Sequence, residues 1–88
     1  MRRNASMASR ALELLGRTIR MERKKRGLSQ ETLAEAADLN RSYLSHIERG
    51  TANVTLLAVL RIARALGIEV TVLLADFPLA KLKRMRLS

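Results

Sequence analysis

Cysteine is absent from this 88-residue chain, and glycine, proline and aromatic residues are scarce. Without cysteine the chain has neither a disulfide framework nor a cysteine-based zinc site, and its single histidine does not suggest a metal site of another kind. No apolar run approaches the roughly 18 residues that a membrane span requires. The remaining residues are mostly aliphatic helix formers. We therefore expect one small all-α domain in the reducing cytoplasm, with no membrane partner and no cofactor.

The usual catalytic groups are missing as well. The chain has no phosphate-cradling glycine loop, no cysteine nucleophile and no converging pair of acids. No residue is therefore assigned a catalytic role, and an enzyme is not expected.

Positive charge is abundant and unevenly distributed. The net charge is +9 and the isoelectric point is near 11.5. Residues 1–28 hold nine Lys or Arg against two acids, residues 29–75 hold four against five, and residues 76–88 hold four against one. This balance predicts a polyanionic partner. Residues 1–7 lack apolar periodicity and are expected to form a basic flexible arm, followed by a domain (8–77) and a basic C-terminal tail (78–88).

Periodic apolar residues, N-capping side chains and glycines separate the helices of the domain. Residues 68–75 are ambiguous, because alternating apolar and polar positions indicate a strand while the run from Leu73 to Ala75 indicates a helical turn; we favour a helix. In the fourth helix we expect an inward face formed by Leu56, Val59, Leu60, Ala63 and Leu66. The predicted helices span residues 8–26, 30–37, 41–49, 56–66 and 70–75.

Residues 29–50, SQETLAEAADLNRSYLSHIERG, have the pattern of two helices that meet at a steep angle. Ala34 is small enough for the closest approach, and Asp38 stands at the turn, where it tolerates a left-handed conformation better than most residues. Apolar residues fill the inward positions. The outward face near the start of the second of these helices is the part that a helix-turn-helix presents to base edges in the major groove. It carries Arg41, Ser42, Ser45 and His46.

Residues 12–75 resemble the Cro and phage-repressor type of helix-turn-helix domain, the XRE family. The stretches that carry the resemblance are IRMERKKRGLSQETLAEAADL, SYLSHIERG and LLAVLRIARALGI. Within the family, the stretch ADLNRSYLSHIERGTANV is most similar to the controller proteins of restriction-modification systems, which regulate their own operons. The resemblance implies a five-helix, lambda-repressor-like fold that binds double-stranded DNA as a symmetric homodimer on a two-part operator.

The resemblance also implies roles for individual residues. The base-reading positions are Arg41, Ser42, Ser45 and His46. The positions that contact or flank the DNA backbone are Ser29, Gln30, Asn40, Tyr43, Arg49, Thr51 and Asn53. Arg23 and Glu48 match an ion pair that joins the first and third helices. Tyr43 could equally be a core residue whose hydroxyl reaches toward a phosphate.

Apolar residues after Leu66 exceed what a small monomer usually buries, which indicates an interface. The residues assigned to this homodimer interface are Leu57, Ile68, Val70, Val72, Leu73 and Phe77. The leading prediction is a sequence-specific, nucleoid-associated transcription regulator, which could also contact RNA polymerase. Two alternatives stay open: an antitoxin that binds a protein toxin and represses its own operon, and a non-specific architectural DNA binder.

Overall fold

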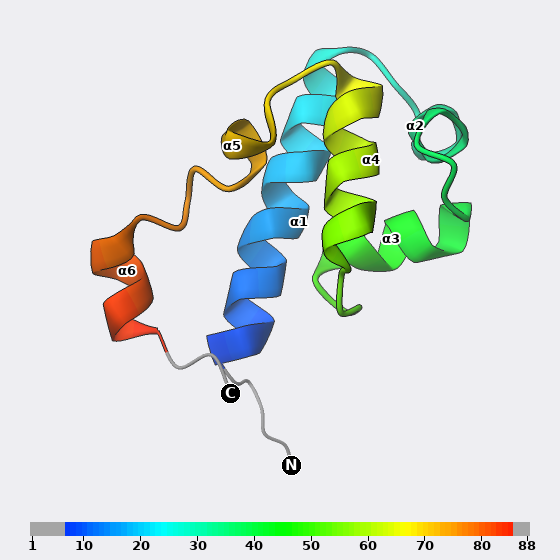
Figure 1. The fold of residues 1–88 in the computed structure, drawn as a ribbon. Helices are drawn as coiled ribbons and strands as arrows, with labels where there is room; N and C mark the ends of the chain where they lie inside the picture. Colours follow the sequence, from blue (N-terminus) through cyan, green and yellow to red (C-terminus); the bar gives the residue numbers. More distant parts are fainter. Residues whose placement is uncertain (1–6, 86–88) are drawn as a thin grey trace.

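The structure is a computed structural model that describes residues 7–85. This part of the chain contains six helices joined by loops and turns (Figure 1). No strand occurs among these residues, so the all-α prediction is confirmed and residues 70–73 are helical. None of the helices in this range is long and apolar enough to cross a membrane. The helices are α1 (Met7–Lys25), α2 (Gln30–Ala36), α3 (Arg41–Arg49), α4 (Leu56–Leu66), α5 (Val70–Leu73) and α6 (Leu79–Arg84).

The ends of the chain differ from the sequence prediction. Met7, assigned to the basic arm, is the first residue of α1, and residues 1–6 lie outside the described part. The predicted tail contains a sixth helix, α6, in addition to the five expected; residues 86–88 lie outside the described part.

The core is aliphatic and consists of residues from α1, α2, α3, α4 and α5. Ile19, Leu33, Leu44 and Ile62 are almost completely buried there. α1 and α4 lie side by side, α3 crosses them, and α2 packs against α3 and α4 at the far end (Figure 1). This arrangement holds the α2–α3 corner against two longer helices.

The inward face of α4 was predicted correctly at Val59, Ala63 and Leu66 and incorrectly at Leu56 and Leu60. Leu56 and Leu60 are 69% and 43% exposed, whereas Ile62, which was not expected inside, is fully buried. Two apolar stripes run along this helix, and the sequence alone does not show which of them faces the core. The stripe that does so consists of Ala58, Val59, Ile62, Ala63 and Leu66.

Leu73 was also misplaced, because it was assigned to a dimer interface and is instead 0% exposed within the monomer. Ile68, Val70 and Phe77 are half-buried and pack against the same core. Of the six predicted interface residues, only Leu57 and Val72 are well exposed, at 56% and 38%. The α5 segment therefore closes the core rather than adding a wholly free apolar surface.

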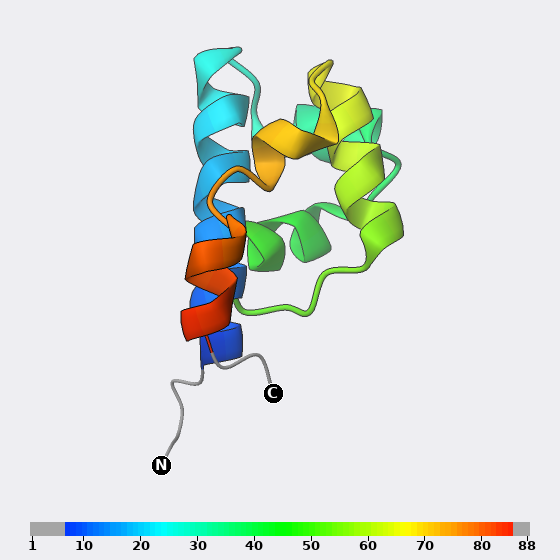
Figure 2. The same cartoon turned by 60° about the vertical axis from the view of Figure 1, so that its left-hand side comes forward.

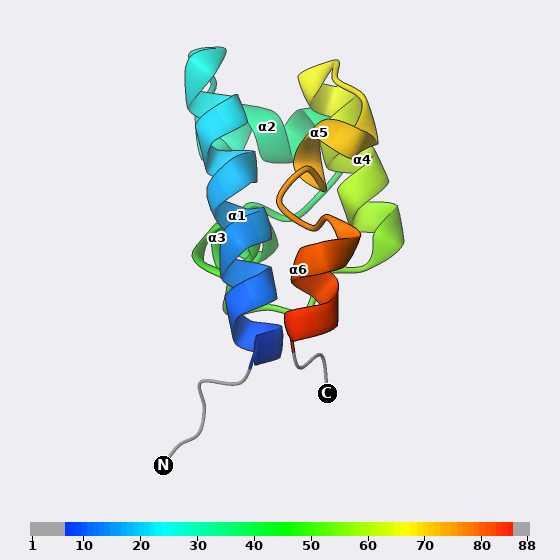
Figure 3. The same cartoon turned by 90° about the vertical axis from the view of Figure 1, so that its left-hand side faces the viewer.

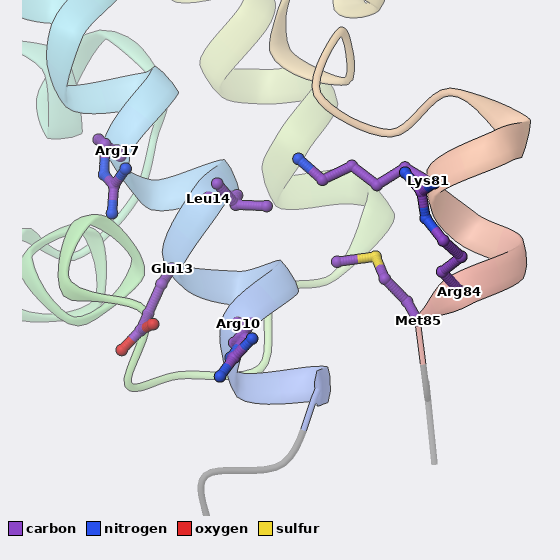
Figure 4. A pocket seen from close by; sticks show the side chains of 7 residues that line it. All are labelled: Arg10, Glu13, Leu14, Arg17, Lys81, Arg84 and Met85. Atoms are coloured by element: carbon purple, nitrogen blue, oxygen red, sulfur yellow. The ribbon is translucent and has the colours of Figure 1, made fainter.

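α6 runs beside the N-terminal half of α1 (Figures 2 and 3). The linker that precedes α6 contacts α1 through Asp76, whose Oδ2 accepts from the hydroxyl of Thr18 at 3.1 Å. A cleft of about 400 Å³ separates the two helices. Leu14, Lys81 and Met85 point into this cleft (Figure 4).

Candidate nucleic-acid interface

The α2–α3 corner is built by local hydrogen bonds. Asp38 has φ 57°, the left-handed conformation that glycine usually occupies. With Asp38 in this conformation, Leu39 N–H donates to Ala34 O at 2.8 Å and Asp38 N–H donates to Glu35 O at 3.1 Å. This pair of bonds ends α2 and turns the chain into α3. Ala34 itself is buried, as the corner requires.

α3 begins at a side-chain cap. Asn40 Oδ1 accepts from the backbone N–H groups of Ser42 at 2.8 Å and Tyr43 at 3.3 Å. Leu44 and Ile47 are buried on the inner side of the helix. The outer side is accessible: Arg41, Ser42 and His46 are exposed and Ser45 is half-buried. We refer to these four residues, which are predicted to contact bases, as the reading face.

The base of α3 is tied to α1 by the predicted ion pair. Arg23 Nε donates to Glu48 Oε2 at 2.7 Å and Nη2 donates to Oε1 at 2.9 Å, and both side chains are buried. The hydrogen bond that Arg23 donates to Glu48 raises the pKa of Arg23 above its ordinary value. Gln30 Nε2 also donates to Glu48 Oε1, at 3.0 Å. Gln30 is half-buried, and one of its two amide hydrogens is directed inward by this bond.

Two residues assigned to the DNA backbone use their hydroxyl groups within the fold. Ser29 caps α2, accepting from Thr32 N–H at 3.0 Å. The hydroxyl of the half-buried Tyr43 donates to Asn53 O at 3.3 Å and accepts from Thr55 N–H at 3.4 Å. Tyr43 thus fixes the loop between α3 and α4 on the protein side. The other backbone candidates, Asn40, Arg49, Thr51 and Asn53, are exposed.

The ring of His46 is oriented by its neighbours. Its Nδ1 lies 3.3 Å from Arg49 Nη2 and 3.0 Å from Thr51 Oγ1. A guanidinium group can only donate, so Nδ1 accepts, and the proton of the neutral ring is assigned to Nε2 from this network. The exposed imidazole therefore offers an N–H donor at Nε2.

α1 and α3 approach each other unusually closely at Gly16. A Cβ added to Gly16 would lie against Ile47 O and only 2.6 Å from Glu48 O. At the end of α3, a Cβ added to Gly50 would lie 2.7 Å from Glu13 Cα. Only hydrogen fits at these two points, so α1 and α3 are held in one fixed relationship.

This close approach brings together residues that sequence reasoning did not combine. Arg17 and Arg20 of α1 and Arg49 of α3, all exposed, line one hollow with Glu13 and Glu48. Neither Arg17 nor Arg20 was among the residues predicted to contact DNA. The available signal was Gly16, a glycine in the middle of a helix whose other residues are good helix formers, which often marks a packing contact.

Comparisons with known proteins agree with this geometry. The helix-turn-helix family model HTH_3 matches residues 19–73. The control protein C.BamHI of Bacillus amyloliquefaciens is 47% identical over 57 residues, which are 64% of this chain and 70% of that protein. The crystal structure of the restriction-modification controller protein C.AhdI from Aeromonas hydrophila superposes with a TM-score of 0.72 at 45% identity, covering 73% of this chain and 97% of that one. The controller protein C.Esp1396I, as a tetramer in complex with its natural 35 base-pair operator, has a TM-score of 0.68 at 31% identity over 74% of this chain and 86% of that one.

Proposed function

Because the chain belongs to the HTH_3 family of helix-turn-helix proteins, of the Cro/C1 type, we propose that it is a sequence-specific DNA-binding transcription regulator without catalytic activity. The observation that carries this proposal is the exposed reading face, held by the corner at Asp38 and by the buried Arg23–Glu48 pair. A major groove accepts one α-helix, and a fixed base of α3 gives that helix a defined angle of entry. The protein then works in the cytoplasm, on the nucleoid.

The reading face supplies different hydrogen-bonding groups at successive positions. Arg41 provides a fork of donors that suits O6 and N7 of guanine, and Ser42 and Ser45 provide hydroxyl groups that donate or accept. His46 provides the Nε2 donor, which fits a base-edge acceptor such as guanine O6 or N7 or thymine O4. Asn40, Arg49, Thr51 and Asn53 surround these residues and are proposed to contact phosphates, with Gln30 supplying its second amide hydrogen. Phosphate contacts set the register, and base contacts set the sequence.

The protein acts as a homodimer, which places two copies of α3 about 34 Å apart on one face of the duplex. The apolar residues available for the interface are not quite those predicted. Three leucines on the outer stripe of α4 and two residues at α5 are exposed, and an apolar surface of this kind is typical of an interface. They are Leu56, Leu57, Leu60, Val72 and Leu74.

A finer proposal is that the chain is a restriction-modification controller that regulates its own operon. Its support is the similarity to C.BamHI and C.AhdI, with the match to C.AhdI covering nearly all of that controller. The identity of the genes next to its own gene distinguishes a controller from an antitoxin. Neighbouring restriction and methyltransferase genes support the controller, whereas a neighbouring ribonuclease or kinase toxin gene would replace it with the antitoxin alternative.

Selection of bound duplexes from a random pool tests the general function. We expect enrichment of two related half-sites whose centres lie about 10 base pairs apart, one helical turn. The half-site position that loses its preference in a His46→Ala variant should be a guanine or thymine. A pool that shows no enrichment after selection would overturn sequence-specific binding and leave the non-specific architectural alternative.

A further inference from the structure

The hollow between α1 and α3 lies next to the reading face but belongs largely to α1. It measures about 290 Å³ and is lined by Glu13, Arg17, Arg20, Glu48 and Arg49. We propose that this α1–α3 hollow binds phosphates of the DNA backbone beside the bases that α3 reads. α1 is then a second DNA-contacting helix as well as a support for the corner. The inference rests on the proposed function and adds a binding site to it.

The charge of the hollow favours an anion. Arg17, Arg20 and Arg49 are exposed, and within residues 7–85 none of them forms an ion pair. Glu48 contributes little negative charge to the surface, because its carboxylate is buried and bonded to Arg23 and Gln30. Glu13 is the one lining acid without an ion pair in the described range, so three guanidinium groups face one free carboxylate.

The position of the hollow favours DNA over another anionic partner. Arg49 lies on the same helix as the reading face, three residues after His46, and its Nη2 contacts the His46 ring at 3.3 Å. Any duplex that meets His46 therefore passes close to Arg49 and to the two arginines beside it. Guanidinium groups bind phosphate oxygens with charge-assisted hydrogen bonds, which makes them suitable for a DNA backbone.

The α1–α6 cleft is a second space lined by residues of the same helix. Glu13 and Arg17 border both spaces, and in Figure 4 Leu14 points from α1 toward α6. That cleft has Leu14 and Met85 among its lining residues and includes no residue of α3. The hollow, which shares Glu13 and Arg17 with this cleft, also contains Arg49 of α3, and the phosphate site is therefore assigned to the hollow.

Rigid packing makes the arginines of α1 useful for register. The contacts of Gly16 with the carbonyls of Ile47 and Glu48, and of Gly50 with Glu13, leave α1 no room to slide along α3. Phosphates bound by Arg17 and Arg20 are thus held at a fixed distance from the bases under α3. Arg17 and Gly16 precede residue 19, where the family match begins, so this contribution lies partly outside the matched region.

Salt dependence of DNA binding tests the inference. The variant Arg17→Gln/Arg20→Gln is compared with Lys83→Gln/Arg84→Gln, which removes the same charge from exposed positions of α6. The probes are a duplex obtained by selection with the wild-type protein and a random duplex, titrated between about 0.05 and 0.2 M salt. For the α1 variant we expect roughly 10-fold weaker binding at the low-salt end and a slope of log K against log salt that is smaller by about 2, on both duplexes. The α6 control should change the slope by less than about 0.5.

A variant that is expected to bind DNA more tightly distinguishes loss of a phosphate contact from loss of folding. Glu13→Gln removes the acid that repels phosphate and should tighten binding about 2- to 3-fold at low salt, on both duplexes. An α1 variant that behaves like the α6 control, or that weakens only the selected duplex, would overturn the phosphate site. Unchanged or weaker DNA binding by the Glu13→Gln variant would also overturn the phosphate site. Wild-type preference for the selected duplex is read from the same titrations, so failure of the proposed function is seen separately.

Discussion

Arg23 of α1 and Glu48 of α3 form a bidentate ion pair with N–O distances of 2.7 and 2.9 Å. The two residues are 25 positions apart in the chain. Both side chains are almost fully buried, at 9% and 2% exposed. A buried pair of this kind does not add much stability compared with well-packed apolar residues, but it is strongly coupled. Its position at the base of α3 makes it an orienting element.

Removal of one partner should therefore be costly. Glu48→Gln leaves the Arg23 charge buried without a counter-charge, and we expect a loss of about 3–5 kcal/mol in the free energy of unfolding, measured by urea denaturation. Glu35→Gln, an exposed glutamate on α2, is the control and should change stability by less than about 0.5 kcal/mol. Equal stabilities of the two variants would show that the pair is not coupled as the geometry indicates. The apolar double variant Arg23→Met/Glu48→Leu should recover much of the loss.

Arg41 is the residue on which base reading is tested most directly. Arg41→Ala should weaken binding to a selected duplex by about 1–3 kcal/mol and relax the preference at one base pair, because a bidentate contact with a base edge is lost. Binding to random duplexes should change little. Lys83→Ala, also exposed, is the control. Equal weakening on selected and random duplexes would instead make Arg41 a phosphate contact.

Local signals explain why most of the corner was predictable. Ser29, Asn40 and Thr55 cap α2, α3 and α4, each accepting from a backbone N–H two or three residues later. Asp38 adopts the left-handed conformation assigned to it. These features depend on a few neighbouring residues, and the spacing of capping and apolar side chains in the sequence is enough to locate them.

The errors concern features that depend on distant partners. Leu56 and Leu60 were expected inside and Ile62 was not, because α4 has two apolar stripes and only the positions of α1, α2 and α5 determine which of them is buried. Leu73 was expected at the surface and fills the core instead. The approach of Gly16 to the carbonyls of Ile47 and Glu48 joins two segments about 30 residues apart. A glycine in the middle of a helix indicates a close contact, but no local pattern identifies the partner of that contact.

Glu22 makes stability depend on pH at the acid end. Arg26 Nη1 donates to its carboxylate at 2.8 Å and Lys25 lies at 3.4 Å, and these interactions, with the Arg26 hydrogen bond as the main cause, lower the pKa of Glu22 below 4.5. Because the folded-state pKa is below the unfolded value, the stabilisation is fully present above the unfolded pKa and is lost as the pH falls through the folded pKa. The wild type should therefore lose stability relative to Glu22→Gln as the pH falls below 4.5. Urea denaturation of both proteins at about pH 7 and about pH 3 checks this, and a difference between them that does not change with pH would contradict it.

The dimer surface is tested by charge introduced at its exposed leucines. Leu57 and Leu60 both lie on the outer stripe of α4, 56% and 43% exposed, so glutamate at either position leaves the core of the monomer intact. Leu57→Glu/Leu60→Glu should raise the dissociation constant of the dimer at least about 10-fold, since two apolar contacts per protomer become buried like charges. Sedimentation equilibrium measures this change, and urea denaturation checks that the monomer is folded.

The control for the dimer test is Leu79→Glu on α6, an equally large change at a leucine that is 67% exposed and outside the proposed surface. It should leave the dimer unchanged. Leu73→Glu, by contrast, should unfold the protein, because Leu73 lies inside the core of one protomer. If Leu57→Glu/Leu60→Glu stays dimeric while Leu79→Glu becomes monomeric, the two copies meet through α6, and the spacing of the two reading helices on DNA has to be derived from that contact instead.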